Sequence, residues 1–159
     1  MNGILLINKE AGMTSRDVVN QVCHILNTKK VGHTGTLDPL ATGVMVVCVG
    51  NATKMVEVIT ASEKEYIANV ILGTKTDTGD ITGNILEEQE TYITLEKLMN
   101  ACEQMTKTYE QTVPIYSAVK INGKKLYEYA RRKELVSLPK RQVTIYELDL
   151  LSEPIYENG

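Results

Sequence analysis

The sequence predicts an α+β fold, in which strands and helices mix without regular βαβ repeats. Short apolar runs that end in glycine or polar residues are typical of strands, and two amphipathic segments behind threonine caps are typical of helices. The chain has 159 residues, of which 43% are hydrophobic. This is enough for one hydrophobic core and too little for two comfortable ones. We therefore expect a single domain over residues 1–159.

The first elements are expected to be a strand and a helix. Residues 3–8 (GILLIN) form a short apolar run that leads into a turn. Residues 14–27 place apolar side chains at helical spacing behind a Thr14/Ser15 cap, with Asp17 in the first turn. The pattern predicts a helix over this range.

The middle of the chain alternates between strand and helix patterns. Residues 44–50 (VMVVCVG) are typical of a strand buried on both faces. Residues 51–61 resemble a short capped helix, and residues 64–73 (KEYIANVILG) alternate as a strand does. Residues 74–83 consist of turn-forming residues throughout.

The second half repeats this mixture. An amphipathic helix is expected over residues 94–105, followed by an extended segment over residues 108–123. Residues 124–134 predict a basic helix, and residues 142–151 predict a strand.

Charge is distributed unevenly along this chain. The formal net charge is −3, which taken alone argues against a nucleic-acid-binding protein. However, the segment 120–141 contains eight basic residues and two acidic ones, a local charge of +6 that leaves about −9 for the rest. Such a concentration of positive charge favours contacts with nucleic-acid phosphates.

Several classes of protein are disfavoured by composition. Cys23, Cys48 and Cys102 are widely scattered without a C-x-x-C pair, so we expect neither a disulfide framework nor a metal site. The first apolar run is too short for a signal peptide or a membrane span, which favours a cytoplasmic protein with no membrane partner.

The loop at residues 32–43 (GHTGTLDPLATG) holds one aspartate among three glycines and three threonines. Its glycines allow a close approach to a ligand, but neither the P-loop nor the dinucleotide-binding pattern is present. A phosphate-binding nucleotide enzyme is therefore disfavoured. An isolated Asp-Pro pair most often only forms a turn, so Asp38 has to be judged within the whole loop.

Residues 30–54 (KVGHTGTLDPLATGVMVVCVGNATK) strongly resemble the signature of the TruB-type tRNA pseudouridine synthases. Residues 6–20, 64–80 and 111–131 resemble further motifs of this family in the same order. The resemblance covers residues 3–150 and implies the pseudouridine synthase fold, a mixed, largely antiparallel sheet with flanking helices. Glu10 and Val113 stand where prolines are usual, which is expected to loosen two turns without affecting the chemistry.

The resemblance implies isomerisation of a uridine in the T loop of tRNA, position 55 in the family, without a cofactor. Asp38 matches the catalytic aspartate that acts at ribose C1′, and Tyr66 matches a tyrosine that stacks on the flipped base. His33 matches a histidine that contacts the RNA. Lys9 and Lys120 match positions near the cleft or the RNA, although either could equally be a surface lysine. Residues 113–141, with Arg131 and Arg132, match an RNA-gripping insertion.

Members of the family continue into a segment with a further tyrosine and an arginine that pairs with the aspartate. No stretch of this chain matches that segment, so the resemblance implies a catalytic domain that is incomplete at its C-terminal end. We expect the full-length enzyme to be a monomer and the fragment to self-associate through exposed sheet edges. The alternative is a noncatalytic RNA-binding or RNA-folding module, or an inactive fragment of such an enzyme.

Overall fold

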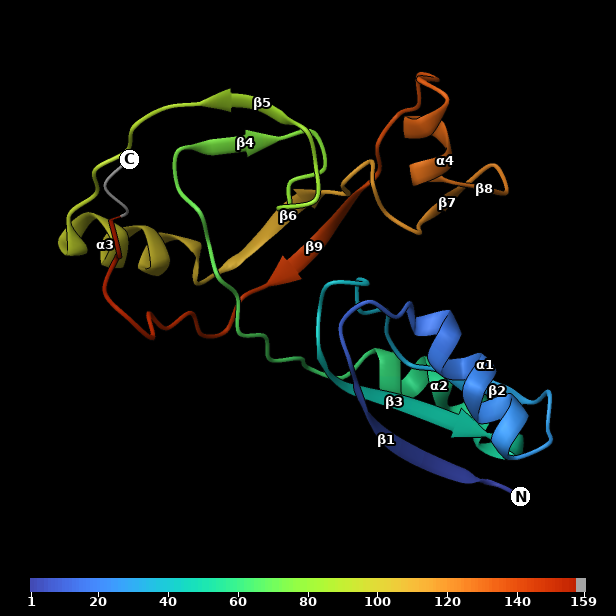
Figure 1. Ribbon diagram of the computed structural model, residues 1–159. Coiled ribbons are helices and arrows are strands. Elements are labelled where there is room, and N and C mark those ends of the chain that lie inside the picture. The colour runs from blue at the N-terminus through green and yellow to red at the C-terminus, as the bar shows by residue number, and fades with distance from the viewer. Residues whose placement is uncertain (157–159) are drawn as a thin grey trace. The chain divides into compact units, whose positions relative to one another are not determined.

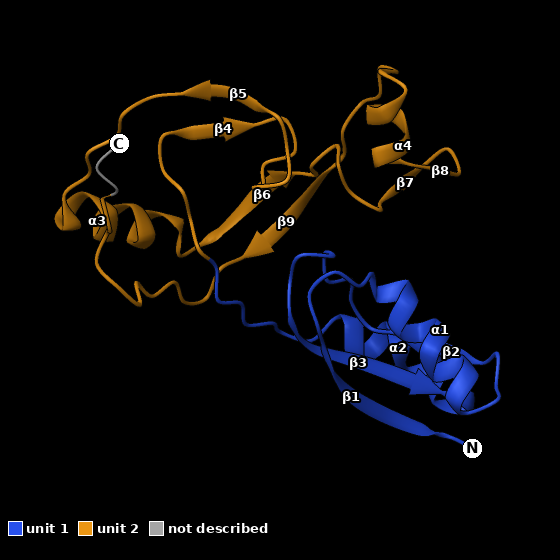
Figure 2. Ribbon diagram, viewed as in Figure 1, with its two compact units in different colours: residues 1–68 blue, residues 69–159 orange. Residues whose placement is uncertain are grey.

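The computed structural model describes residues 1–156 and divides the chain into two compact units, residues 1–68 and 69–159 (Figure 2). The predicted domain runs to Gly159, and its last three residues lie outside the described range. Every strand pair within residues 1–156 is antiparallel (Figure 1). The predicted α+β class with largely antiparallel pairing is therefore confirmed.

The first unit is built on a three-stranded sheet with the order β1-β3-β2. These strands are β1 (Gly3–Lys9), β2 (Val31–His33) and β3 (Gly43–Val49). Along the central strand, Val47 pairs with Leu5 on one side and with His33 on the other. Strand β1 agrees with the predicted strand at residues 3–8.

Helix α1 (Ser15–Ile25) covers one face of this sheet. The Thr14 hydroxyl accepts a hydrogen bond from the Asp17 N–H, and the Asp17 carboxylate accepts one from the Thr14 N–H, which is a complete capping box. The core of the unit joins three valines of α1 to three residues of β3: Val18, Val19, Val22, Met45, Val47 and Val49. Full burial of a valine contributes about 1.5–3 kcal/mol, so the helix is firmly attached to the sheet.

The prediction that residues 44–50 are buried on both faces is only partly correct. Residues 45 and 47–49 are buried, but Val44 is 69% exposed. Val44 lies at the start of the strand, opposite Asn8, on the face that α1 does not cover. After β3, a 3₁₀ turn (Gly50–Met55) and helix α2 (Val56–Thr60) confirm the short helix predicted at residues 51–61.

Within residues 69–156, the second unit consists of three strand pairs and two helices. Strands β4 (Thr74–Thr76) and β5 (Ile85–Glu88) form one pair, and β6 (Thr108–Thr112) and β9 (Lys140–Thr144) form another. Strands β7 (Lys120–Ile121) and β8 (Lys124–Lys125) form a small hairpin. The helices are α3 (Leu95–Met105), capped by Thr94, and α4 (Leu126–Arg131).

Three sequence predictions fail between residues 64 and 151. Residues 64–73 contain no strand, and Ile67, Val70 and Ile71 are between 63% and 81% exposed. A strand needs a partner for its backbone hydrogen bonds, and the alternating pattern does not supply one. The strand predicted at residues 142–151 ends at Thr144, and residues 74–76, predicted as turn, are β4 instead.

Candidate functional site

Asp38 lies in the middle of the loop that connects β2 to β3. Its backbone carbonyl accepts a hydrogen bond from the Ala41 N–H at 3.0 Å, so its backbone does close a turn. Its side chain is exposed, and within residues 1–156 the carboxylate has no hydrogen-bond or ion-pair partner. The turn therefore leaves the carboxylate free to meet a ligand.

Both neighbours of Asp38 are anchored to the segment that runs from the turn after β1 to the first residue of α1. Before it, Leu37 exchanges two hydrogen bonds with the Ser15 hydroxyl, each 3.0 Å long. After it, the Pro39 carbonyl accepts the Gly12 N–H at 2.8 Å. Gly12 has φ +86°, a left-handed conformation in which glycine carries no side-chain clash. The backbone on either side of Asp38 is thus fixed by hydrogen bonds to Gly12 and Ser15.

Lys9 reaches the same loop from the end of β1. Its side chain is only 1% exposed. Its ammonium donates to the backbone carbonyls of Met13 (2.8 Å), Glu10 (2.9 Å) and, more weakly, Pro39 (3.4 Å). Three carbonyls match its three N–H donors. The predicted RNA contact of Lys9 stays a prediction, while these bonds give the residue a role in holding the Asp38 loop.

His33 is the last residue of β2 and is partly buried. Its Nδ1 lies 2.7 Å from the Gly35 carbonyl oxygen. A carbonyl oxygen only accepts hydrogen bonds, so Nδ1 must carry the proton. The ring is therefore oriented by its own loop, and Nε2 is not used in this bond.

The other predicted site residues belong to other segments of the chain than the Asp38 loop. Tyr66 is 69% exposed and lies in the segment without regular structure at the end of the first unit. Lys120, Arg131 and Arg132 belong to the second unit. The structure thus brings together Lys9 and the Asp38 loop, with His33 at the start of that loop.

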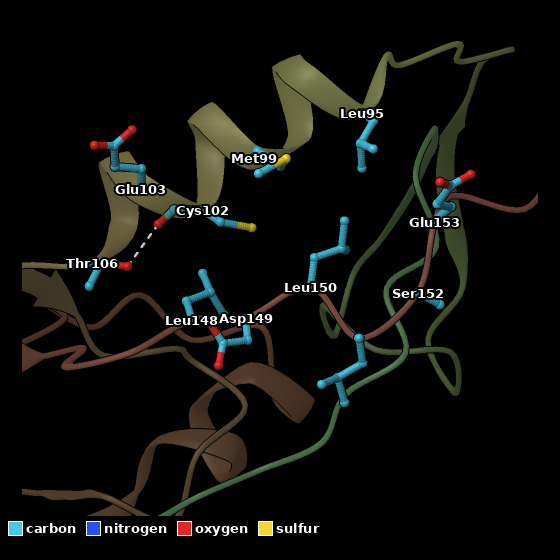
Figure 3. A pocket seen from close by; sticks show the side chains of 11 residues that line it. Leu95, Met99, Cys102, Glu103, Thr106, Leu148, Asp149, Leu150, Ser152 and Glu153 are labelled. Atoms are coloured by element: carbon cyan, nitrogen blue, oxygen red, sulfur yellow. Dashed lines mark hydrogen bonds between the residues drawn. The ribbon is translucent and has the colours of Figure 1, made fainter.

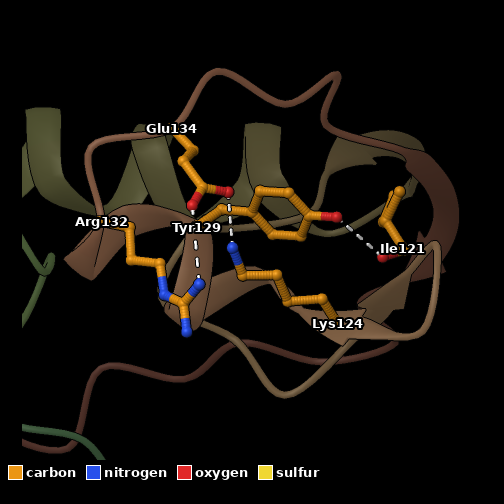
Figure 4. A network of polar contacts seen from close by, with 5 residues as sticks. All are labelled: Ile121, Lys124, Tyr129, Arg132 and Glu134. Atoms are coloured by element: carbon orange, nitrogen blue, oxygen red, sulfur yellow. Dashed lines mark hydrogen bonds and ion pairs between the residues drawn. The ribbon is translucent and has the colours of Figure 1, made fainter.

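The basic segment 120–141 contains a small network of polar contacts (Figure 4). Glu134 binds Lys124 directly, and its second oxygen lies 3.9 Å from Arg132. The Lys124 ammonium lies 4.4 Å from the centre of the Tyr129 ring, and the Tyr129 hydroxyl donates to the Ile121 carbonyl at 3.1 Å. These contacts hold hairpin β7–β8 against α4.

Other cations of this segment are arranged around Tyr127. The Lys125 ammonium is 5.4 Å and the Arg131 guanidinium carbon 5.3 Å from the centre of its ring. Both distances are within the range of cation–π attraction. Lys120 is the backbone partner of Lys125 across the hairpin, so two lysines occupy opposite positions of the strand pair. Like charges directly opposite each other are unfavourable, and a bound anion would relieve this repulsion.

The Glu134 contact gives a pH-dependent prediction. The hydrogen bond from Lys124, together with the nearby charges of Lys124 and Arg132, lowers the pKa of Glu134. A lowered pKa in the folded state means that this stabilisation is present above the unfolded pKa and is lost as the pH falls through the folded pKa. In the full-length gene product, meaning the whole polypeptide that the gene encodes, Lys124→Gln should raise the pKa of Glu134. Carbon-13 NMR titration of the Glu134 carboxyl carbon measures this change, and an unchanged pKa would contradict the contact.

The second unit also contains an apolar groove of about 690 Å³ (Figure 3). One side comes from α3 and the other from residues 148–153, with Leu95, Met99, Leu148 and Leu150 among its lining residues. None of the predicted site residues lines this groove. It is therefore not part of the site suggested by the sequence.

Sequence reasoning missed Gly12 and Ser15 as anchors of the Asp38 loop. Ser15 was expected only to share the helix cap with Thr14. Thr14 alone is enough to cap the helix. A Ser15 hydroxyl that is not needed for the cap was the only sequence signal that Ser15 bonds another residue. Its partner, Leu37, is 22 residues away and carries no signal of its own.

Comparison with known families identifies the class of protein to which this fold and the Asp38 loop belong. Residues 23–155 match the family described as TruB family pseudouridylate synthase (N terminal domain). The chain therefore belongs to this family. The family match includes the whole Asp38 loop.

Curated relatives support the assignment. The chain is 48% identical over 161 residues to tRNA pseudouridine synthase B of Bacillus pumilus, covering 100% of this chain and 52% of the relative. It is 50% identical over 155 residues to tRNA pseudouridine synthase B of Geobacillus thermodenitrificans, covering 96% and 51%. The chain thus spans about half the length of the curated relatives it matches.

A solved structure supports the predicted fold. The match to a solved structure of a Cbf5-Nop10-Gar1 complex covers 93% of this chain and 36% of the matched chain, with a TM-score of 0.55 and 23% identity. Among residues 1–156, no helix is both long enough and apolar enough to cross a membrane.

Proposed function

We propose that the full-length gene product isomerises uridine to pseudouridine in the T loop of tRNA. The observation that carries the proposal is the anchored Asp38 loop, which lies within the family match and presents a carboxylate without a protein partner in residues 1–156. The names of the relatives support tRNA as the substrate.

The reaction breaks the bond between ribose C1′ and N1 of uracil and forms a bond between C1′ and C5. The proton on C5 is released and N1 gains one, so no oxidant, reductant or energy source is consumed. In this proposal Asp38 either attacks C1′ or assists a glycal-like intermediate, as an ionised carboxylate can do. The bonds to Leu37 and Pro39 support this role because they fix the backbone from which the Asp38 side chain extends.

The target base has to leave its stack before C1′ becomes accessible. Base flipping costs a few kcal/mol, and stacking on an aromatic side chain returns about 1–3 kcal/mol. We assign this stacking to Tyr66, whose ring is exposed and available. His33 would contact the RNA next to the extruded base, with its ring oriented through Gly35.

Phosphate contacts are assigned to the basic segment, with Lys120, Arg131 and Arg132 as the proposed residues. Arg132 is a surface residue whose side chain is 68% exposed despite its contact with Glu134. Lys9 is buried, and the roles of Lys9 in loop anchoring and in RNA contact can be separated by experiment.

Tritium release from tRNA labelled at C5 of uridine tests the proposal. The full-length gene product should release tritium from a T-arm RNA, and mapping should place the pseudouridine in the T loop. Binding of the RNA without tritium release would instead support a noncatalytic RNA-binding module.

Neutralising Arg131, Arg132 and Lys133 together should weaken RNA binding and flatten its dependence on salt. Removing one lysine or arginine that binds a phosphate is expected to reduce the slope of log affinity against log salt by about one unit. The variant with all three changed to glutamine is compared with a charge-matched control in which Lys54, Lys97 and Lys107 are changed to glutamine. Equal slopes for the two variants would rule out the basic segment as a phosphate-binding site.

A further inference from the structure

Ser15 makes an unusual pair of contacts with the Asp38 loop. Its hydroxyl accepts a hydrogen bond from the Leu37 N–H and donates one to the Leu37 carbonyl, both at 3.0 Å. The residue is only 4% exposed, so water does not readily replace these bonds. The Ser15 side chain therefore hydrogen-bonds both backbone polar groups of Leu37, the residue immediately before Asp38.

The Ser15 hydroxyl is not needed to cap its own helix. Thr14 is the cap residue, and its capping box with Asp17 is complete. A serine at the first helical position normally has its hydroxyl in water or bonded within the first turn. Here the hydroxyl is instead committed to a loop that lies 22 residues further along the chain.

Ser15 belongs to helix α1, which is itself held in place by the core of the first unit. Val18, Val19 and Val22 are at most 6% exposed and pack against the buried side of β3. Ser15 lies one turn before them on the same helix. A movement of Leu37 would therefore have to break the Ser15 bonds or shift a helix that is packed into the core.

We propose that Ser15 is a positioning residue for Asp38, which it holds in place through Leu37. The proposal rests on the proposed function, because positioning matters only if Asp38 acts on the RNA. The Gly12 bond to Pro39 limits movement on the other side of Asp38, but it does not restrain Leu37. Loss of the serine hydroxyl releases the loop on one side and leaves RNA-contacting side chains unchanged.

The test compares four forms of the full-length gene product: wild type, Ser15→Ala, Ser15→Thr and Thr14→Ala. Misplacement of a reacting group by about 1 Å can cost about 10²-fold in rate. Ser15→Ala should reduce kcat by about 10- to 100-fold and change KM for T-arm RNA by less than about threefold. Ser15→Thr keeps the hydroxyl and should recover most of the lost kcat. Thr14→Ala removes the helix cap without touching the loop, and its kcat should stay within about twofold of wild type.

Amide hydrogen exchange supplies a second reading that does not depend on catalysis. The Leu37 N–H should exchange faster in Ser15→Ala than in wild type, while the Val47 N–H in the core strand stays protected. If the wild type releases no tritium, the proposed function fails, and the exchange of Leu37 still shows whether Ser15 anchors the loop.

For Ser15→Ala, either an unchanged kcat or a loss of kcat no larger than that of Thr14→Ala would overturn the proposal. Ser15→Cys fills the same space with a weaker hydrogen-bonding group and replaces the alanine variant if the latter does not fold. Its kcat should lie below that of Ser15→Thr, and a kcat equal to wild type would also overturn the proposal.

Discussion

Replacing Asp38 by asparagine in the full-length gene product should abolish pseudouridine formation and leave RNA affinity within about tenfold of wild type. The substitution removes the charge and keeps nearly the same volume. Loss of a single oriented electrostatic group commonly costs about 10²–10³ in rate, and a group that also attacks the substrate costs more. We therefore expect a loss greater than about 10³-fold.

Tritium release and an RNA-binding titration together measure this effect. Asp149→Asn is the control, because it removes one exposed carboxylate from the other unit. Turnover by Asp38→Asn near the wild-type rate would show that Asp38 only closes its turn with Ala41.

Replacing Lys9 by methionine should lower the free energy of unfolding by about 2–4 kcal/mol, because the carbonyls of Glu10, Met13 and Pro39 lose their charged donor. Methionine fills most of the buried space, so the loss comes mainly from the missing hydrogen bonds. Turnover should also fall, since Pro39 follows Asp38 directly. Urea unfolding measures the change in stability.

The same variant separates the two roles of Lys9. If Lys9 contacted a phosphate, Lys9→Met would reduce the salt slope of RNA binding by about one unit. Its side chain is 1% exposed, so we expect an unchanged slope and a large loss of stability. Lys30→Met, which removes an exposed lysine of the same unit, is the control. A stable Lys9→Met protein with a reduced slope would contradict the anchoring role.

Local signals predicted the first unit well. The Thr14 cap and the spacing of Val18, Val19 and Val22 were sufficient to place α1, because helix formation depends on residues within a few positions of each other. The apolar run at residues 3–8 was likewise sufficient for β1. The resemblance also directed attention to Asp38, within the region that matches the family.

Non-local contacts explain the failures. Residues 64–73 have a strand pattern, but pairing depends on a second segment that their own sequence does not specify. Strand β4 forms at residues 74–76, where the sequence predicts only a turn, because it pairs with β5. The Asp77 carboxylate accepts the Asn84 N–H at 2.9 Å and closes the turn between the two strands. The bond between Ser15 and Leu37 was missed for the same reason, since it joins residues from two separate motifs.

The anchoring of the Asp38 loop also bears on how its sequence can evolve. Ser15 hydrogen-bonds the backbone of Leu37, and Gly12 and Lys9 donate to the backbone carbonyl of Pro39. None of these bonds involves the side chain of a loop residue. Substitutions at exposed positions such as Thr36 and Leu40 are therefore expected to leave the backbone of Asp38 in place. Substitutions of Lys9, Gly12 or Ser15 are expected to displace it, although these residues belong to a separate and earlier stretch of the chain.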